Sequence, residues 1–254
     1  MANGNHKILS FFLFILLFGS LIYLTIFSYN KRGREEIRMI TVTGNSLLNQ
    51  KSYLEFTQLD ENISYSDLTL HGIKNRFEKH PYIIRSEVKS DGRGNVEVYL
   101  KEKIIYAVVV GNNDPYFITA DFQVIPIFPN TIFSELPVIS NARLREKFSA
   151  MNFVKDEDII QAFRIIDAAK TTDLELSTKL AEINLRNGGD VILTFSGINS
   201  PVIFGRGNEA KKMIYLNILW ERMNEQKTYF ENTEYLDLRF SNEVFVGRKD
   251  NIGL

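Results

Sequence analysis

The sequence predicts an α+β protein with an N-terminal transmembrane helix, a small β-α-α-β-β domain and a larger mixed β-sheet domain backed by helices. Three observations lead to this prediction. Residues 8–30 contain no charged side chain. Residues 37–101 place two helical patterns between β-branched and alternating runs, and residues 104–254 contain many short strand patterns with two longer helical ones.

The charge-free run is long enough to cross a membrane. At about 1.5 Å per residue a helix over it would reach roughly 35 Å, against about 30 Å for a hydrocarbon core. We predict a transmembrane helix at residues 8–29, between a short tail at residues 1–7 and a juxtamembrane segment at residues 30–36. The alternative is a cleaved signal peptide, whose apolar region is shorter and is followed by small residues. Residues 24–29 instead read LTIFSY.

Charges beside the run leave its orientation open. Lys7 and the N-terminal amine precede it, whereas Lys31, Arg32, Arg34 and Arg38 follow it. Short flanks rich in Lys and Arg tend to stay in the cytoplasm, so these charges alone favour an N-terminus outside it. That rule weakens for long translocated domains, so the charges do not decide the topology.

Composition excludes several classes of protein. The chain has 30 basic and 31 acidic residues and a net charge of −1, without the basic excess of a nucleic-acid-binding domain. It has no cysteine, which excludes disulfides and thiolate metal sites. The absence of cysteine suits an oxidising compartment outside the cytoplasm. We therefore expect no nucleic-acid partner.

Residues 37–101 predict a small α+β layer. In residues 95–101, VEVYLK follows Asn95 and alternates apolar with polar side chains, as in a strand with one buried face. Residues 91–94 read DGRG and predict a glycine turn before this strand. The order β-α-α-β-β places helices on one face of a three-stranded sheet. We expect strands at residues 37–43, 82–89 and 95–101, and helices at residues 49–59 and 66–80.

The remainder predicts a mixed sheet backed by two helices. Asn208 is the expected N-cap of the second helix, because its side chain can accept a backbone N–H there. We expect the helices at residues 158–169 and 208–226, and strands at residues 104–110, 116–120, 123–127, 136–139, 181–185, 191–195, 201–204, 235–239 and 243–247.

One motif points toward a dinucleotide. Residues 205–210 read GRGNEA and fit G-x-G-x-x-A, a fingerprint that places pyrophosphate over the N-terminus of a helix. That fingerprint opens a βαβ unit, and we expect this helix to lead into a terminal hairpin rather than a parallel strand. We therefore interpret Gly205 and Gly207 as a turn into a capped helix and predict no cofactor.

Catalytic and metal-binding patterns are sparse. His6, His71 and His80 form no H-x-x-x-H or H-E-x-x-H pair, and no G-x-S-x-G elbow occurs. We interpret His80, before Pro81, as a cation that caps a helix C-terminus. The acidic residues 156–158 suit a first helical turn. We predict no catalytic residue, no metal site and no small-molecule substrate. Carboxylates that are distant in sequence can still meet, so a membrane-anchored cell-wall enzyme stays an alternative.

Several segments together resemble a known family. Residues 37–45 (IRMITVTGN), residues 80–83 (HPYI), the strand around Val88 and residues 96–103 (VEVYLKEK) are similar to a POTRA domain. With the anchor before them, a β-rich domain after them and YLDLRF at residues 235–240, they resemble the FtsQ/DivIB bacterial cell-division proteins. The resemblance implies a POTRA domain at residues 37–103 and a β domain at residues 104–254.

Membership in this family would imply topology and function. The N-terminus would lie in the cytoplasm and the bulk of the chain outside the bacterial inner membrane, at the division septum. The protein would be a scaffold and no enzyme. It would bind small coiled-coil proteins of the FtsB/DivIC and FtsL types, with FtsK-like and FtsW/FtsI-like proteins as further partners, and couple division-site assembly to septal peptidoglycan synthesis. A POTRA-bearing protein of outer-membrane assembly or secretion is the other alternative, but its β-barrel needs more chain.

The resemblance also implies a binding site on the last strand. An edge strand exposes N–H and C=O groups that an extended partner segment can satisfy. The alternative is a terminal strand that only completes the sheet. Arg248 departs from the family pattern, which has an aromatic residue there. Comparison with the motif assigns this partner-binding edge to Phe240, Ser241, Asn242, Glu243, Val244, Phe245, Val246, Gly247 and Arg248.

Overall fold

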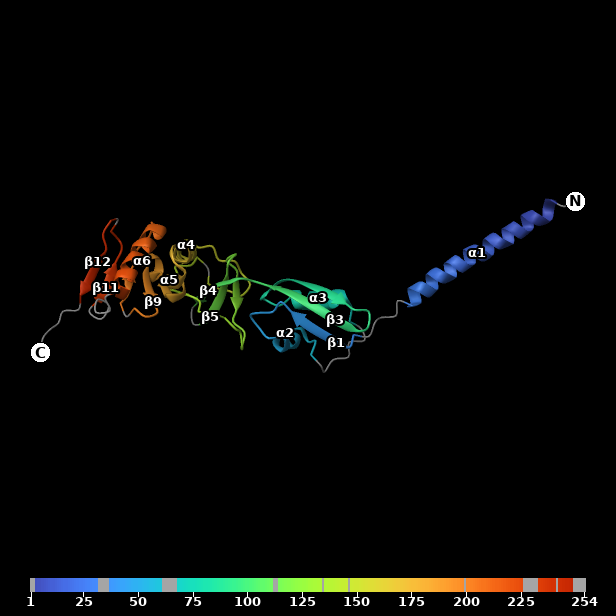
Figure 1. Ribbon diagram of the computed structural model, residues 1–254, viewed down its shortest axis with the longest axis horizontal. Coiled ribbons are helices and arrows are strands. Elements are labelled where there is room, and N and C mark those ends of the chain that lie inside the picture. The colour runs from blue at the N-terminus through green and yellow to red at the C-terminus, as the bar shows by residue number, and fades with distance from the viewer. Residues whose placement is uncertain are drawn as a thin grey trace. The chain divides into compact units, whose positions relative to one another are not determined.

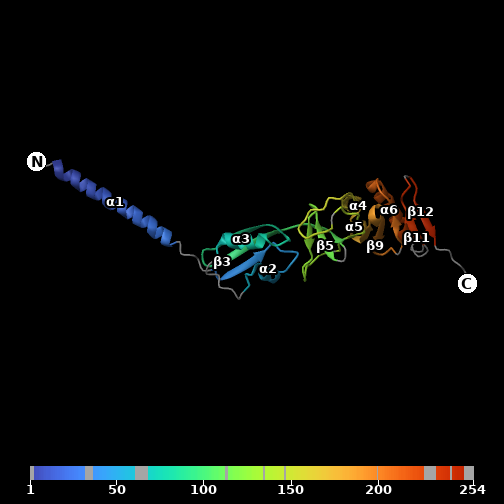
Figure 2. The same cartoon turned by 180° about the vertical axis from the view of Figure 1, so that it is seen from behind.

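The chain divides into two compact units. The first unit comprises Met1–Gly44, Gln50–Glu78 and Arg85–Leu100, and the second comprises Asn45–Asn49, Lys79–Ile84 and Lys101–Leu254. Figures 1 and 2 show the chain from two opposite sides. The computed structural model describes residues 3–31, 37–60, 68–111, 114–133, 135–145, 147–198, 200–225, 233–240 and 242–248.

Helix α1 covers Asn3–Lys31, so a helix forms where the sequence predicts one. Its described side chains, residues 11–27, are exposed. Phe14 stacks on Phe18, and Tyr23 stacks on Phe27, at the spacing of one helical turn. Among the described residues, no helix combines the length and the hydropathy of a membrane span.

A three-stranded sheet follows in the order β1-β3-β2, with β1 and β3 parallel. The predicted alternation is confirmed in β3, where Val96, Val98 and Leu100 are buried. Tyr53 and Phe77, from the two helices of this part, are also buried. The elements are β1 (Met39–Thr43), α2 (Gln50–Thr57), α3 (Leu70–Glu78), β2 (Ile83–Ser90) and β3 (Asn95–Glu102). Helix α3 begins at Leu70, and the start predicted at residue 66 lies outside the described residues.

In the second unit the described residues form a nine-stranded mixed sheet. Its order is β12-β11-β10-β9-β8-β7-β4-β5-β6. The mixed sheet predicted from the sequence is thus confirmed. The strands are β4 (Ile105–Val110), β5 (Pro115–Thr119), β6 (Val124–Pro126), β7 (Val138–Ser140), β8 (Leu180–Asn184), β9 (Ile192–Phe195), β10 (Val202–Ile203), β11 (Thr233–Asp237) and β12 (Phe245–Arg248).

Two helical crossovers connect parallel neighbours in this sheet. Helices α4 (Glu157–Thr172) and α5 (Leu174–Lys179) connect β7 to β8, and α6 (Glu209–Glu225) connects β10 to β11. Helices α4 and α6 contact each other (Figure 1). Sequence reasoning expected two helices and missed α5. The expectation that no parallel strand follows α6 is wrong, because Val202 pairs with Leu236 in a parallel register.

Hydrophobic side chains of α4 and α6 pack into one core with the sheet. Each helix presents residues at three- and four-residue spacing, so one face is apolar. The core contains Ile159, Phe163 and Ile166 from α4, Met213, Leu216 and Trp220 from α6, and Leu193, Val202 and Leu236 from the sheet.

His80 is not the cationic helix cap expected from the sequence. It is 2% exposed, and its Nδ1 atom accepts the N–H of Tyr82 at 3.1 Å. Its ring packs against the rings of Tyr82 and Phe128. Burial and, to a smaller extent, the charge of Lys103 lower the pKa of His80 to about 4. The imidazole is therefore neutral at pH 7, and its role is to pack inside the second unit.

Gly44 connects β1 to the following turn in a conformation that only glycine adopts easily. Its φ is +75°, and a Cβ atom there would lie 2.5 Å from the carbonyl oxygen of Leu100. Gly207 has the same φ of +75°, but a Cβ atom there would have no neighbour within 4 Å. Alanine substitutions at these two positions would share the backbone strain, and only the one at Gly44 would add steric overlap.

We expect Gly44→Ala to destabilise the first unit by about 2–5 kcal/mol, because left-handed strain of about 1–2 kcal/mol is added to overpacking of about 1–3 kcal/mol. Gly207→Ala should cost the second unit only the strain of about 1–2 kcal/mol. Amide hydrogen exchange of β3 and of β9 in the full chain measures both effects. Equal losses in the two units would contradict the steric argument.

Candidate partner-binding edge of the second sheet

Strand β12 is the outermost strand at one end of the nine-stranded sheet, and its neighbour is β11 (Figure 1). Of the residues 240–248 that were assigned to the partner-binding edge, the last four form this strand and the others precede it. Residues Phe245, Val246, Gly247 and Arg248 constitute β12, whereas Phe240, Asn242, Glu243 and Val244 lie in the connection from β11, and Ser241 lies outside the described residues.

Backbone hydrogen bonds show which way β11 faces. Leu236 donates its N–H to the carbonyl of Pro201 at 3.0 Å, and Leu238 donates to the carbonyl of Ile203 at 2.9 Å. Both N–H groups therefore point toward β10. Successive residues of a strand direct their backbone polar groups to opposite sides. Asp237, between the two leucines, consequently faces β12.

The register then orients β12. Asp237 pairs with Phe245, and Tyr235 pairs with Gly247. These two pairs exchange the hydrogen bonds between the strands, since the partners on β11 face β12. Val246 lies between them, so its N–H and C=O point away from β11, at the open side of the sheet. A donor and an acceptor are thus presented in the geometry that an added strand requires.

Apolar side chains accompany these backbone groups. Phe240 is 51% exposed, Phe245 is 47% exposed and Val246 is 38% exposed. The rings of Phe240 and Phe245 meet edge to face, with their centroids 4.7 Å apart. Gly247 lies under the ring of Tyr235, where a Cβ atom would overlap the ring. The edge therefore offers apolar contact area as well as backbone groups.

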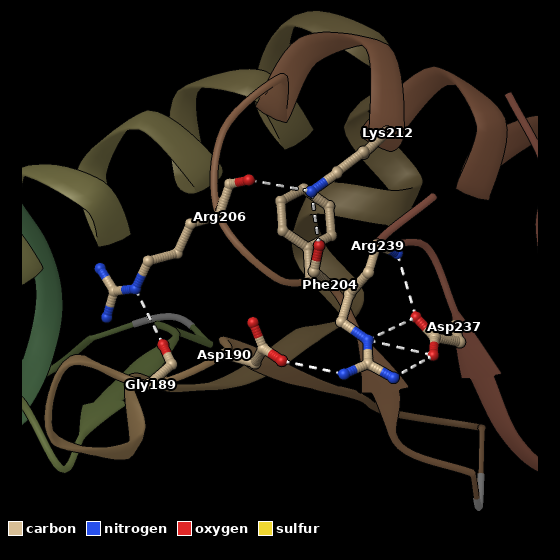
Figure 3. A network of polar contacts seen from close by, with 7 residues as sticks. All are labelled: Gly189, Asp190, Phe204, Arg206, Lys212, Asp237 and Arg239. Atoms are coloured by element: carbon tan, nitrogen blue, oxygen red, sulfur yellow. Dashed lines mark hydrogen bonds and ion pairs between the residues drawn. The ribbon is translucent and has the colours of Figure 1, made fainter. Parts of the chain in front are cut away.

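An ion pair holds the chain where it leaves β11. Asp237 is 4% exposed, and Arg239 donates to its carboxylate from Nε at 3.0 Å, from a terminal nitrogen at 2.6 Å and from its backbone N–H at 3.0 Å (Figure 3). Hydrogen bonds from Arg239 hold the pKa of Asp237 below its usual value. The other terminal nitrogen of Arg239 contacts Asp190 at 3.0 Å, in the connection that precedes β9. Arg239 thereby joins two connections of the sheet.

A buried lysine joins a third connection to the same region. Lys212 of α6 is 6% exposed, and its ammonium donates to the carbonyls of Phe204 at 2.8 Å and Arg206 at 3.2 Å (Figure 3). Burial lowers the pKa of Lys212, which the charges of Glu209 and Asp190 partly oppose. The first turn of α6 is thus fixed to the end of β10.

Turn residues 205–207 belong to this framework. A Cβ atom on Gly205, whose φ is +65°, would lie 2.9 Å from Cγ of Arg239. The Arg206 side chain donates to the carbonyl of Gly189 at 2.8 Å and forms an ion pair of 2.8 Å with buried Asp158. The βαβ setting that we expected to be missing is therefore present, but Arg206 extends to Gly189 and Asp158 as a structural bridge.

Asn208 does not cap α6 with its side chain as predicted. Its φ is +57°, whereas a capping residue adopts an extended backbone. Its carbonyl accepts the N–H of Lys212 at 3.0 Å, and Glu209 Oε1 accepts the N–H of Gly207 at 3.0 Å. The acidic side chain of the first turn satisfies this N–H instead.

Sequence reasoning missed the roles of Lys212, Asp237 and Arg239. The burial of Lys212 could have been predicted from the sequence, because Lys212 lies on the same helical face as the apolar residues Met213 and Leu216 of α6. A charge at such a position is buried, and a buried charge needs partners. Asp237 and Arg239 appeared only as letters of the YLDLRF motif, whose spacing does not reveal an ion pair.

We expect Asp237→Asn to lower the free energy of unfolding by about 2–3 kcal/mol at pH 7, because a buried hydrogen-bonded charge is lost. The folded pKa is depressed, so the contribution is present above the unfolded value of about 3.9 and disappears as pH falls through the folded value. Urea unfolding of the full chain should therefore show that the difference in free energy of unfolding between the original protein and Asp237→Asn disappears below about pH 4.

Asp190→Asn is the matched control, since Asp190 contacts the same guanidinium but its side chain is 49% exposed. It should change the free energy of unfolding by less than about 0.5 kcal/mol. Similar losses in the two variants would show that burial of Asp237 is not what makes its ion pair matter.

Comparison with known proteins agrees with this architecture. A family model described as cell division protein FtsQ/DivIB, C-terminal, matches residues 107–239. The match runs from β4 to Arg239 and covers just over half of the chain. A search of curated proteins gives no match. The family predicted from the sequence is thus confirmed, and the chain belongs to the FtsQ/DivIB family of cell-division proteins.

Proposed function

We propose that this chain is a non-enzymatic scaffold of the division machinery, and that β12 binds an extended segment of a small coiled-coil division protein of the FtsB/DivIC type. The observation that carries the proposal is the outward direction of the Val246 N–H and C=O on an outermost strand. Membership in a cell-division family supports it.

Partner binding would proceed by strand addition. An antiparallel or parallel partner strand would pair with Val246 and extend the sheet by one strand. Backbone pairing supplies affinity, whereas side-chain contacts select the partner. The exposed rings of Phe240 and Phe245 provide apolar contacts, and exposed Arg248 provides a charge at the end of the strand.

The proposal places α1 in the bacterial inner membrane as a single-pass anchor, with the N-terminus in the cytoplasm and the remainder outside. The charge-free run at residues 8–30 supports the anchor. The order β-α-α-β-β supports a POTRA domain at residues 37–103, with the β domain at residues 104–254. An anchor confines the scaffold and its partners to one surface and raises their effective concentration.

At the septum the scaffold would bind FtsB/DivIC-like and FtsL-like proteins, and through them act on septal peptidoglycan synthesis. FtsK-like and FtsW/FtsI-like proteins are the further partners of this proposal. The family match supports the link to cell division.

Val246→Pro should abolish capture of an FtsB-like partner by the full chain. Proline removes the outward N–H and places its ring toward the incoming strand, but it leaves the hydrogen bonds between β11 and β12 intact. Co-purification from detergent-solubilised membranes measures capture, and the melting temperature reports folding.

Val246→Ala is the control, because it retains the N–H and shortens only the side chain. It should preserve most of the capture. Normal capture by a well-folded Val246→Pro protein would contradict the assignment of β12 as the pairing edge.

The anchor has a separate test. The full chain should stay with the membrane fraction after alkaline carbonate extraction, whereas a variant without residues 3–31 should be released, because the charge-free helix supplies the hydrophobic attachment. Release of the full chain would exclude a transmembrane anchor.

A further inference from the structure

A cavity of about 550 Å³ lies in the second unit at the carboxyl ends of three parallel strands. Val110 ends β4, Ser140 ends β7, and Asn187 follows β8, and all three residues line the cavity. Strand β7 is parallel to both β4 and β8. In open α/β sheets, ligands bind at the carboxyl ends of the parallel strands. The volume falls within the range of about 300–1,000 Å³ that ligand pockets show.

Cations dominate the charge of this cavity. Arg143, Arg145 and Lys147 line it, and none of the lining residues that the structure describes is acidic. Arg145 lies 3.7 Å from Asp156, although the Arg145 side chain is 88% exposed. Among the described residues, no ion pair engages the side chains of Arg143 or Lys147. Residues 143–147 also include Glu146, which lies outside the described residues, so the net charge of this run is +2. A ligand that carries negative charge would still be attracted.

The backbone around the cavity is held firmly. Asn187 donates its N–H to the carbonyl of Asn141 at 2.7 Å, and Leu185 donates to the carbonyl of Ser140 at 3.0 Å. Asn141 and Asn187 have φ values of +50° and +53°. Left-handed residues persist where the surroundings impose them, and they are enriched at binding sites. The Arg143 side chain extends over Gly188, with Cδ 3.2 Å from the position of a Cβ atom there.

An apolar wall faces part of the cavity. Phe148, Leu144 and Val110 line it beside the cations. The Phe148 ring lies close to Gly111, 3.3 Å from the position of a Cβ atom. Asn141 and Asn187 add amide groups that can both donate and accept hydrogen bonds. The cavity thus combines positive charge, apolar surface and amides, which together suit a peptide.

The adjacent cavity differs in charge although it shares three lining residues with the first. It has a volume of about 470 Å³, and its lining includes Asp156, Glu157, Asp158 and Arg206. Asp158 is buried, accepts the backbone N–H of Arg143 at 2.7 Å and pairs with Arg206 at 2.8 Å. The three acidic and three basic residues that line this second cavity balance in charge, whereas the described lining of the first cavity carries only cations.

We propose that the cavity lined by Arg143, Arg145 and Lys147 binds a short acidic peptide segment that carries an apolar side chain next to its carboxylates. The arginines donate to carboxylates, and the Phe148 wall accepts the apolar side chain. A hydrated anionic glycan would leave this wall uncovered, which favours the peptide. The site is separate from β12 and does not depend on the strand-addition proposal.

The test uses the full chain in a neutral detergent and a fluorescent peptide, GDEFDEG, with the uncharged peptide GNQFNQG as its twin. We expect saturable binding of the acidic peptide only, measured by fluorescence anisotropy and weakened by added salt. Arg143→Gln and Lys147→Gln should each weaken binding at least about threefold, and the double variant about tenfold, because each removes a charge-assisted contact.

Lys89→Gln is the matched control, since Lys89 is an exposed cation on β2 in the first unit. It should leave the affinity unchanged, and unchanged melting temperatures would show that all variants fold. Equal binding of the two peptides, or unchanged affinity in the folded double variant, would overturn the proposal. Binding of polyglutamate or a sulfated glycan without binding of the short peptide would overturn the assignment to a peptide.

Discussion

The ion pair between buried Asp237 and exposed Arg239 fixes the end of β11 and thereby the start of the connection to β12. Its second partner, Asp190, brings in the connection before β9. Cγ of Arg239 lies so close to Gly205 that glycine is required there. Arg239 therefore contacts the end of β11, the connection before β9 and the turn at Gly205, and these contacts together fix the backbone next to the edge strand (Figure 3).

The buried charges of this framework are all paired or hydrogen-bonded. A buried charge is unfavourable unless hydrogen bonds and opposite charges surround it. Lys212 donates to two carbonyls, Asp237 accepts from Arg239, and Asp158 accepts from Arg206, so each buried charge has several partners. Such partners can hold the end of a sheet whose outermost strand keeps backbone groups open. An open edge of this kind is also a template for unwanted pairing with other chains.

Sequence reasoning predicted the elements with strong periods and missed those without one. The alternation of β3 and the helical spacing of α4 identified both elements, since each buries one face. Strand β10 has only the two residues Val202 and Ile203, too few to show a period, so its parallel pairing with β11 was not expected. The burial of His80 depends on the rings of Tyr82 and Phe128, of which the latter is distant in sequence. The cations of the cavity are close in sequence, but the cavity itself forms where three strand ends meet, and no single segment of the sequence shows that.

The direct test of the central claim is residue-resolved amide hydrogen exchange on β12, in the free chain and with an FtsB-like partner bound. The N–H groups of Phe245 and Gly247 face β11 and should be protected in both states. The N–H of Val246 should exchange rapidly in the free chain and become protected at least about a hundredfold in the complex, as a new ladder hydrogen bond forms. Rapid exchange of Val246 in the complex would contradict the account.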